Sequence, residues 1–168
     1  MRLRRFFVLL SFLPIFGVVP ANAGSPNDGT LSVRGGKGLV QLSSRGTMIG
    51  RIERGKLTVT DPNPFDARKP IVLGAESRTR SRNMKTTVYR GRDIRLRVTG
   101  GLAHVRFEGR GIQLSAVGRG AGLIQAAPQP VKVPVSNGFW SLNDEEYQPL
   151  PEELTRFQLV GPPPPEQG

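Results

Sequence analysis

The sequence repeats itself once, and this internal duplication constrains the fold more than any other feature. Residues 31–59 align with residues 96–124 at a constant offset of 65 positions and without a gap. Two shuffled segments of this Gly- and Arg-rich composition would share about three identities. Nine aligned pairs are identical: Leu31/Leu96, Val33/Val98, Gly35/Gly100, Gly36/Gly101, Val40/Val105, Arg45/Arg110, Gly46/Gly111, Arg54/Arg119 and Gly55/Gly120. The alignment therefore predicts two copies of one structural unit.

Each copy alternates apolar and polar residues in short runs, as β-strands do. In the second copy, Ile94, Leu96 and Val98 alternate with polar residues, and the alternation resumes over residues 103–107. A period of two places the apolar side chains on one face of a sheet and the charged ones on the other. In the first copy, Ile49 and Ile52 are three positions apart, which predicts a β-bulge at the intervening glycine, residue 50. Glycine-bearing turns divide each copy into four short strands.

These patterns predict an all-β fold, a sandwich or flattened barrel built from two duplicated four-stranded units, residues 31–59 and 96–124. The linker between the copies supplies further strands. Residues 131–135 are expected to form an edge strand, because Pro134 has no N–H to donate. A β-solenoid is the alternative, although it would have shorter and more regular rungs than a 65-residue period supplies.

The first 23 residues have the features of a signal peptide. Basic Arg2, Arg4 and Arg5 precede an apolar run, and Ala21-Asn22-Ala23 supplies a cleavage pattern before Gly24. The apolar run of residues 6–19 is shorter than the roughly 20 residues that a spanning helix needs. The protein is therefore expected to be secreted, extracellular or associated with the cell wall, with no transmembrane segment after cleavage.

The rest of the chain is expected to form one domain. Residues 24–30 are polar and predict a flexible leader, residues 31–160 a single β domain, and residues 161–168 a disordered Pro-rich tail. The sequence has no cysteine, so no disulfide stabilises this domain.

Positive charge is concentrated in the duplicated region and its linker. Residues 31–124 contain 19 basic and six acidic residues, a net charge of +13, whereas residues 125–168 contain two basic and six acidic residues. Clustered arginines bind phosphates and carboxylates and attract polyanions. The candidate anion-binding residues are Arg78, Arg80, Arg82, Lys85, Arg90, Arg92, Arg95 and Arg97. The alternative interpretation is a solvated sheet face, partly neutralised by the acidic residues of segment 144–153.

Catalytic patterns are weak. His104 is the only histidine and there is no cysteine, so the sequence offers no zinc-type ligand cluster and implies no cofactor. The G-x-S-x-G pattern of a nucleophile elbow is absent. Acidic residues 144–146 lie beside Trp140 and Tyr147, an arrangement that a sugar subsite would share. A secreted hydrolase at this position is the less favoured alternative.

Two runs in the second copy, Gly91-Arg92-Asp93-Ile94 and residues 110–120 (RGIQLSAVGRG), resemble segments of small secreted all-β proteins of actinobacteria. That family has no assigned function. The resemblance covers mainly residues 91–120 and implies an all-β fold and export, without a catalytic residue.

Together these observations predict a secreted, non-catalytic β module of the bacterial cell envelope that binds an anionic polymer or lipid surface through an Arg-rich face. Export and the scarcity of aromatic residues near the arginines disfavour nucleic acid as the partner. The main alternative is a structural or assembly protein that pairs through edge strands such as residues 131–135.

Overall fold

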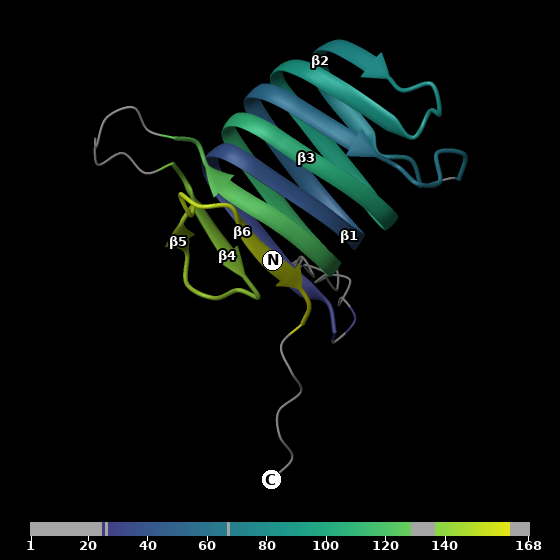
Figure 1. Cartoon of the computed structure of the whole chain (residues 1–168). Helices are drawn as coiled ribbons and strands as arrows, with labels where there is room; N and C mark the ends of the chain where they lie inside the picture. The colour runs from purple at the N-terminus through teal and green to yellow at the C-terminus, as the bar shows by residue number, and fades with distance from the viewer. Residues whose placement is uncertain (1–24, 26, 67, 129–136, 162–168) are drawn as a thin grey trace, which may run out of the picture.

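A computed structural model describes residues 25, 27–66, 68–128 and 137–161, and within these residues it contains strands and no helix (Figure 1). The strands are β1 (Gly29–Thr60), β2 (Ile71–Arg80), β3 (Thr86–Ala126), β4 (Phe139–Leu142), β5 (Gln148–Pro149) and β6 (Thr155–Leu159). All the strand pairings are antiparallel and belong to one sheet. The all-β prediction is confirmed, and a sheet that folds over on itself is compatible with a flattened barrel or sandwich.

Strands β1 and β3 wind around a common interior as a two-stranded antiparallel ribbon. Most of β1 pairs with two different parts of β3: Val40, for example, has both Phe107 and Ile124 as register partners. These partners are 17 positions apart, so β3 returns to the same β1 residue after one turn of the winding. Figure 1 shows the resulting stack of slanted ribbons, in which segments of β1 and β3 alternate. Each strand thus winds repeatedly around one interior and comes back beside its partner. A β-solenoid, the alternative fold, also winds around one interior.

Some register pairs of the ribbon are related by the 65-residue offset of the sequence alignment, whereas the burial pattern over residues 47–52 is opposite to that over residues 112–117. Val40 pairs with Ile124, and Val59 pairs with Val105. Under the 65-residue offset, Val40 corresponds to Val105 and Ile124 corresponds to Val59. One pair therefore maps onto the other. The offset found in the sequence thus exchanges the two strands of the ribbon, as a pseudo-twofold axis between them would.

The four short strands expected in each copy are successive legs of one continuous strand. Strand β1 runs for 32 residues and β3 for 41 without a break. The glycines expected in turns lie at corners of the winding, where two pairs of them face each other across the strands: Gly46 with Gly118 and Gly55 with Gly109. A straight strand of 32 residues would extend for about 105 Å, so the corners are what make the fold compact.

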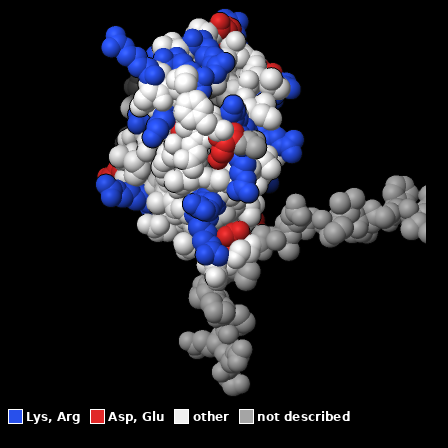
Figure 2. Space-filling model, turned by 90° about the vertical axis from the view of Figure 1, so that its right-hand side faces the viewer, with Lys and Arg blue, Asp and Glu red and all other residues white. Residues whose placement is uncertain are grey.

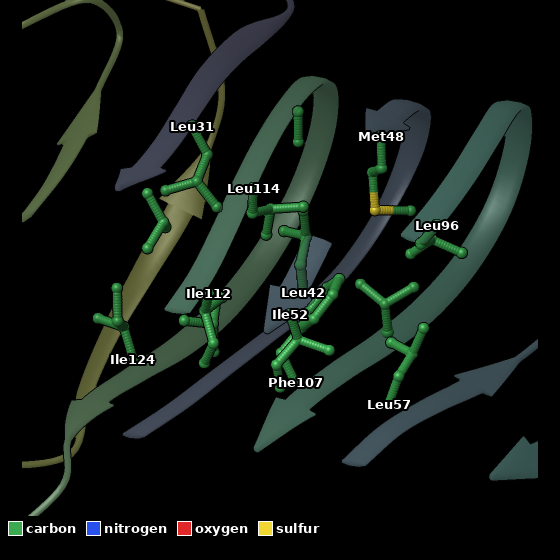
Figure 3. Close-up of a cluster of buried hydrophobic side chains, with 14 of the residues drawn as sticks. Leu31, Leu42, Met48, Ile52, Leu57, Leu96, Phe107, Ile112, Leu114 and Ile124 are labelled. Carbon is green, nitrogen blue, oxygen red and sulfur yellow. The ribbon is translucent and has the colours of Figure 1, made fainter. Parts of the chain in front are cut away.

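The core lies inside the winding and consists of the inward-facing residues of both long strands. Figure 3 shows the side chains of Leu42, Ile52, Phe107 and Ile112 pointing into the same interior from different legs. Phe107 and Ile52 have no exposed surface. The alternation predicted for residues 94–98 and 103–107 is present, with the apolar member of each pair buried.

The bulge predicted at Gly50 is wrong. The ladder from Ile49 to Ile52 pairs residue by residue with the segment from Arg97 to Ile94, without a skipped position. Met48, Gly50 and Ile52 therefore face inward, and Ile49 faces outward with 58% of its surface exposed. Glycine stands in this inward row because the ring of Phe107 occupies the space: a Cβ on Gly50 would lie 2.5 Å from its Cζ.

The two ends of the winding carry different additions. At one end, β2 pairs with β3 and forms the edge of the sheet. At the other end, β4 pairs with the start of β1, β5 with β4, and β6 with the end of β3. In Figure 1 these additions lie at opposite ends of the ribbon stack.

The N-terminal leader is held at this second end. The side chain of Arg119 donates hydrogen bonds to Asp28 Oδ1 at 3.1 Å and to Ser25 Oγ at 2.8 Å. Strand β1 begins at Gly29, just before the expected first strand residue, Leu31.

Three predictions concern residues outside the described ranges: the signal peptide of residues 1–23, the edge strand at residues 131–135 and the tail from residue 162 onward. Among the residues that the structure does describe, none forms a helix of the length and hydrophobicity that crossing a membrane requires.

Candidate anion-binding site

The eight predicted cationic residues do not share one face: six of them lie on three different surfaces, Arg82 lies in a turn, and Arg90 is exposed with Lys56 and Ser77 as its register partners. Arg78 and Arg80 belong to β2 and pair with Tyr89 and Thr87, whose side chains turn toward the interior. With Lys85 they line a small pocket of about 90 Å³ at the end of the winding, where the Arg78 guanidinium lies 5.7 Å from the centre of the Tyr89 ring. Strand β2 ends at Arg80, so Arg82 does not continue its alternation and lies in the following turn.

A second group forms a row of arginines at one corner of the winding. Arg54 has Arg92 as its register partner on one side and Arg110 on the other, and all three side chains are exposed. We call this row the arginine ridge. Lys37 joins Arg54 and Arg110 around an open pocket of about 400 Å³. Neighbouring strands are about 4.8 Å apart, so the ridge places three cations within about 10 Å.

The ridge arginines have no ion-pair partner among the described residues. The ion pairs within the described part of the chain have Asp28, Asp93 and Glu108 as their acidic partners, and none of them includes a ridge arginine. Like charges directly opposite one another in a sheet destabilise the pairing. An external anion would relieve this repulsion, which makes the ridge a candidate binding site.

The third group lines a groove on the outer face of the sheet. Ile71, Arg97, Ile49 and Ser115 are successive register partners in one row, and the adjacent row consists of Leu73, Arg95, Arg51 and Gln113. These two rows, with Ser32 and Arg34 at the far side, line a groove of about 830 Å³. Among the predicted cationic residues, only Arg95 and Arg97 belong to this groove.

One carboxylate sits among the groove arginines. Asp93 accepts a hydrogen bond from Arg95 at 2.7 Å and another from Nε of Arg51 at 2.5 Å. These bonds, that from Arg95 first, lower the pKa of Asp93 below its ordinary value. Asp93 therefore stays ionised and holds two of the groove arginines, whereas Arg97 has no ionic partner in the described chain.

Glu108, two residues before the ridge residue Arg110, is a second carboxylate that pairs with cationic side chains. Burial alone would raise the pKa of Glu108, but hydrogen bonds from Arg106 and Lys56 outweigh burial and lower it. Arg106 donates to Glu108 Oε1 at 2.9 Å, and Lys56 pairs with the other carboxylate oxygen. Glu108 thus partly compensates the charges of Arg106 and Lys56, whereas the arginines of the ridge have no such partner in the described chain.

Figure 2 shows the face on the right of Figure 1, where Lys and Arg side chains gather in several clusters and acidic groups are fewer. The acidic segment 144–153 is at the end of the winding that does not carry β2, and it reaches the end of β3, where the Ala126 N–H donates to the Pro151 carbonyl oxygen. It follows β4 and contacts the start of β1, where Tyr147 Oη donates to Ser32 Oγ at 2.6 Å. No ion pair within the described residues joins this segment to the cationic residues of 78–97.

The neighbourhood of the hypothetical hydrolase site differs from an open sugar subsite. Trp140 is only 6% exposed and packs against Phe157, with ring centroids 5.8 Å apart. Tyr147 is half-buried, with the Arg34 guanidinium 4.1 Å from its ring centre. Asp144, Glu145 and Glu146 are exposed around this packed cluster, so neither aromatic ring is presented beside them as a stacking platform.

His104 has a polar partner that the sequence did not indicate. Its Nδ1 lies 2.7 Å from Ser43 Oγ on the adjacent strand. A hydrolytic triad would also need a carboxylate on the imidazole, and no such bond occurs in the described chain. The described residues also contain no cluster of three His, Cys, Asp or Glu side chains that could hold a metal ion.

The chain was compared with protein-family models, curated proteins and solved structures, and none of these comparisons found a match. The case for a function therefore depends on the surface chemistry of the winding itself.

Proposed function

We propose that this chain is a non-catalytic, exported β module of the bacterial cell envelope that binds an anionic polymer or surface. The observation that carries this proposal is the arginine ridge of Arg92, Arg54 and Arg110. Its three guanidinium groups are exposed on adjacent strands and lack ionic partners in the described chain. Arginine binds phosphate and carboxylate groups through two parallel hydrogen bonds.

The shape of the ridge favours an extended ligand over a single small anion. The row crosses the strands, so its charges follow one another along the axis of the winding at intervals of about 4.8 Å. A polyanion lying along this axis would meet several guanidinium groups in succession. Each contact is weak when exposed, but contacts to one linked chain reinforce one another.

The distribution of charge supports the same ligand class. The acidic segment packs at the β4–β5 end, where its polar contacts include the hydrogen bond from Tyr147 to Ser32. Among the described residues it forms no ion pair with Arg54, Arg92 or Arg110, and these three arginines are exposed. The basic surface would still attract polyanions over a Debye length of about 10 Å at moderate ionic strength.

Assembly through edge strands is the second candidate, because β2 is an outer strand of the sheet. Its sequence opposes such pairing. The register between β2 and β3 is irregular at Ala75, and Glu76, Arg78 and Arg80 are exposed along the strand. Irregularities and charged side chains on an edge strand hinder its pairing with another chain.

The proposal is tested by measuring how the chain, without residues 1–23, binds immobilised phosphate-rich wall polymer and polyphosphate. We expect retention at about 50 mM salt and release well below 1 M, where the Debye length is only about 3 Å. The triple variant Arg54→Gln, Arg92→Gln, Arg110→Gln should bind at least ten-fold more weakly.

The matched control removes the same charge elsewhere. Arg45, Arg68 and Arg156 are also exposed and lie outside the ridge, so their replacement by Gln should reduce affinity much less. Equal losses in both triple variants would show that net charge, not the ridge, causes binding. A wild-type chain that is not retained even at low salt would refute the proposed function.

A further inference from the structure

The outer-face groove combines apolar and cationic side chains in a way that simple polyanion binding does not need. Ile49, Ile71 and Leu73 are 58%, 55% and 62% exposed, although each belongs to a well-ordered ladder. They line the same groove of about 830 Å³. Apolar side chains gathered in a concave surface indicate a binding site more strongly than the same residues scattered singly.

The dimensions of the groove suit a hydrocarbon chain. It crosses five successive strand segments, which are residues 71–73, 95–97, 49–51, 113–115 and 32–34. At about 4.8 Å per strand spacing, this amounts to about 19 Å. The hydrocarbon core of a bilayer is about 30 Å thick, so one acyl chain of a leaflet extends about 15 Å. A single acyl chain would fit along the groove.

The charges of the groove lie among its apolar side chains, since Arg97 has Ile71 and Ile49 as its register partners, and they define the headgroup of the ligand. Arg34, Arg51, Arg95 and Arg97 all line it, and Asp93, beside it, holds only Arg51 and Arg95. An anionic headgroup could therefore bind Arg97 directly and compete with Asp93 for its two arginines. A neutral lipid would leave these cations without a counterion, whereas a small anion would leave the apolar side chains in water.

We propose that this groove binds the acyl chain of an anionic lipid, with the headgroup phosphate held by the groove arginines. This inference rests on the proposed function and names one ligand class for it. A second copy of the chain is a poorer occupant, because a twofold interface places the same surface against itself. Arginines would then face arginines across a desolvated interface.

The test uses monomeric dioctanoyl phosphatidylglycerol below its micelle concentration, with glycerol phosphate as the headgroup alone and dioctanoyl phosphatidylcholine as the zwitterionic lipid. Affinities are measured by titration calorimetry on the chain without residues 1–23. We expect the anionic lipid to bind at least ten-fold more tightly than either comparison ligand. Equal affinity for the lipid and glycerol phosphate would overturn the proposal, as would equal affinity for the two lipids.

Variants that leave the net charge unchanged distinguish lipid binding by the groove from polymer binding by the ridge. Ile49→Thr with Leu73→Thr removes apolar surface and places β-branched threonine, which suits a strand, at both positions. This double variant should bind the anionic lipid at least five-fold more weakly and bind wall polymer as the wild type does. The control Leu102→Thr with Val160→Thr changes two exposed apolar residues outside the groove and should leave lipid affinity unchanged.

Circular dichroism and thermal melting establish that each variant is folded. Unchanged lipid binding in a folded Ile49→Thr, Leu73→Thr variant would refute the groove site. So would a wild-type dimer in sedimentation that this variant dissociates, because the apolar surface would then belong to a homodimer interface. Either result would leave polymer binding by the ridge intact, whereas loss of polymer retention in the wild type would refute the proposed function itself.

Discussion

Gly55 and Gly109 face one another across adjacent strands at a corner of the winding, and each occupies space that a side chain would need. A Cβ on Gly109 would lie 2.2 Å from the carbonyl oxygen of Arg54, and one on Gly55 would lie 2.2 Å from that of Glu108. Both have positive φ angles, 156° and 152°. The two strands can approach this closely at the corner only because both residues lack a side chain.

Replacing Gly109 by Ala should therefore destabilise the fold through both backbone strain and overlap with the carbonyl. We expect the free energy of unfolding to fall by about 2 kcal/mol or more, measured by chemical denaturation. Gly35 is the matched control, because it also has a positive φ of 64° but no atom within 4 Å of its hypothetical Cβ. Gly35→Ala should cost about 1 kcal/mol. Equal losses at the two positions would contradict the close-approach argument.

Gly50 and Phe107 provide a second packing test, in the core rather than at a corner. Gly50→Ala would place a methyl group against the Phe107 ring and should lower the free energy of unfolding by about 1–3 kcal/mol. Combining it with Phe107→Leu should cost less than the sum of the two single substitutions, since the smaller side chain makes room. A double-mutant cycle of denaturation measurements checks this coupling. Strict additivity would mean that the ring does not explain the glycine.

The stability of the protein should decrease in acid because of Asp93 and Glu108. Both carboxyl groups have a lowered pKa in the folded chain, so they bind protons more weakly than in the unfolded chain. Their stabilisation is fully present above the unfolded pKa values of about 4, and it is lost as the pH falls through the lower folded values. Denaturation series across this pH range should show a shallower dependence for Glu108→Gln than for the wild type. An unchanged slope would contradict the assigned ion pairs.

Neutralising Asp93 should strengthen lipid binding, because its carboxylate competes for Arg51 and Arg95. Asp93 has a positive φ of 52°, a conformation that Asn tolerates. Asp93→Asn should bind dioctanoyl phosphatidylglycerol at least three-fold more tightly in calorimetry. Asp144→Asn is the control, with a similar φ of 59° and a position outside the residues that line the groove. An equal gain in both variants would show a general charge effect.

The acidic segment should have little influence on polymer binding. Replacing Asp144, Glu145 and Glu146 by Asn, Gln and Gln removes three exposed negative charges between β4 and β5, none of which forms an ion pair with a ridge arginine in the described chain. Retention on wall polymer should change by less than two-fold. A ten-fold gain would show instead that this segment covers the cationic surface in solution.

Some residues show how well the local sequence pattern predicts which side chains are buried. The alternation over residues 94–98 and 103–107 correctly predicts which side chains are buried, because strand geometry turns successive residues to opposite faces. The same reasoning placed Ile49 inside, whereas Met48 and Gly50 are there. Both Ile49 and its aligned partner Leu114 are apolar, but only Leu114 is buried. Apolar character alone did not reveal which residue of the first copy faces the core.

The candidate sites were harder to anticipate from the chain. Arg95 and Arg97 share the outer face as their spacing of two suggests, but Arg78 and Arg80 face a different pocket. Arg54 and Arg110 were missed because they are far apart in sequence and become neighbours only through strand pairing. The apolar run of residues 71–73 is the one local signal for the groove, but three consecutive apolar residues do not show which of them face outward.

Local pattern and composition are enough to predict the strand content, the two-residue alternation and the excess of positive charge. These properties depend on short-range geometry and composition, which act within a few residues. Which cations become neighbours depends instead on strand pairing. Winding two long strands around each other places residues 18 positions apart, Arg92 and Arg110, on either side of Arg54. The ridge and the groove are properties of that register, and they exist because the glycine corners let each strand return beside its partner.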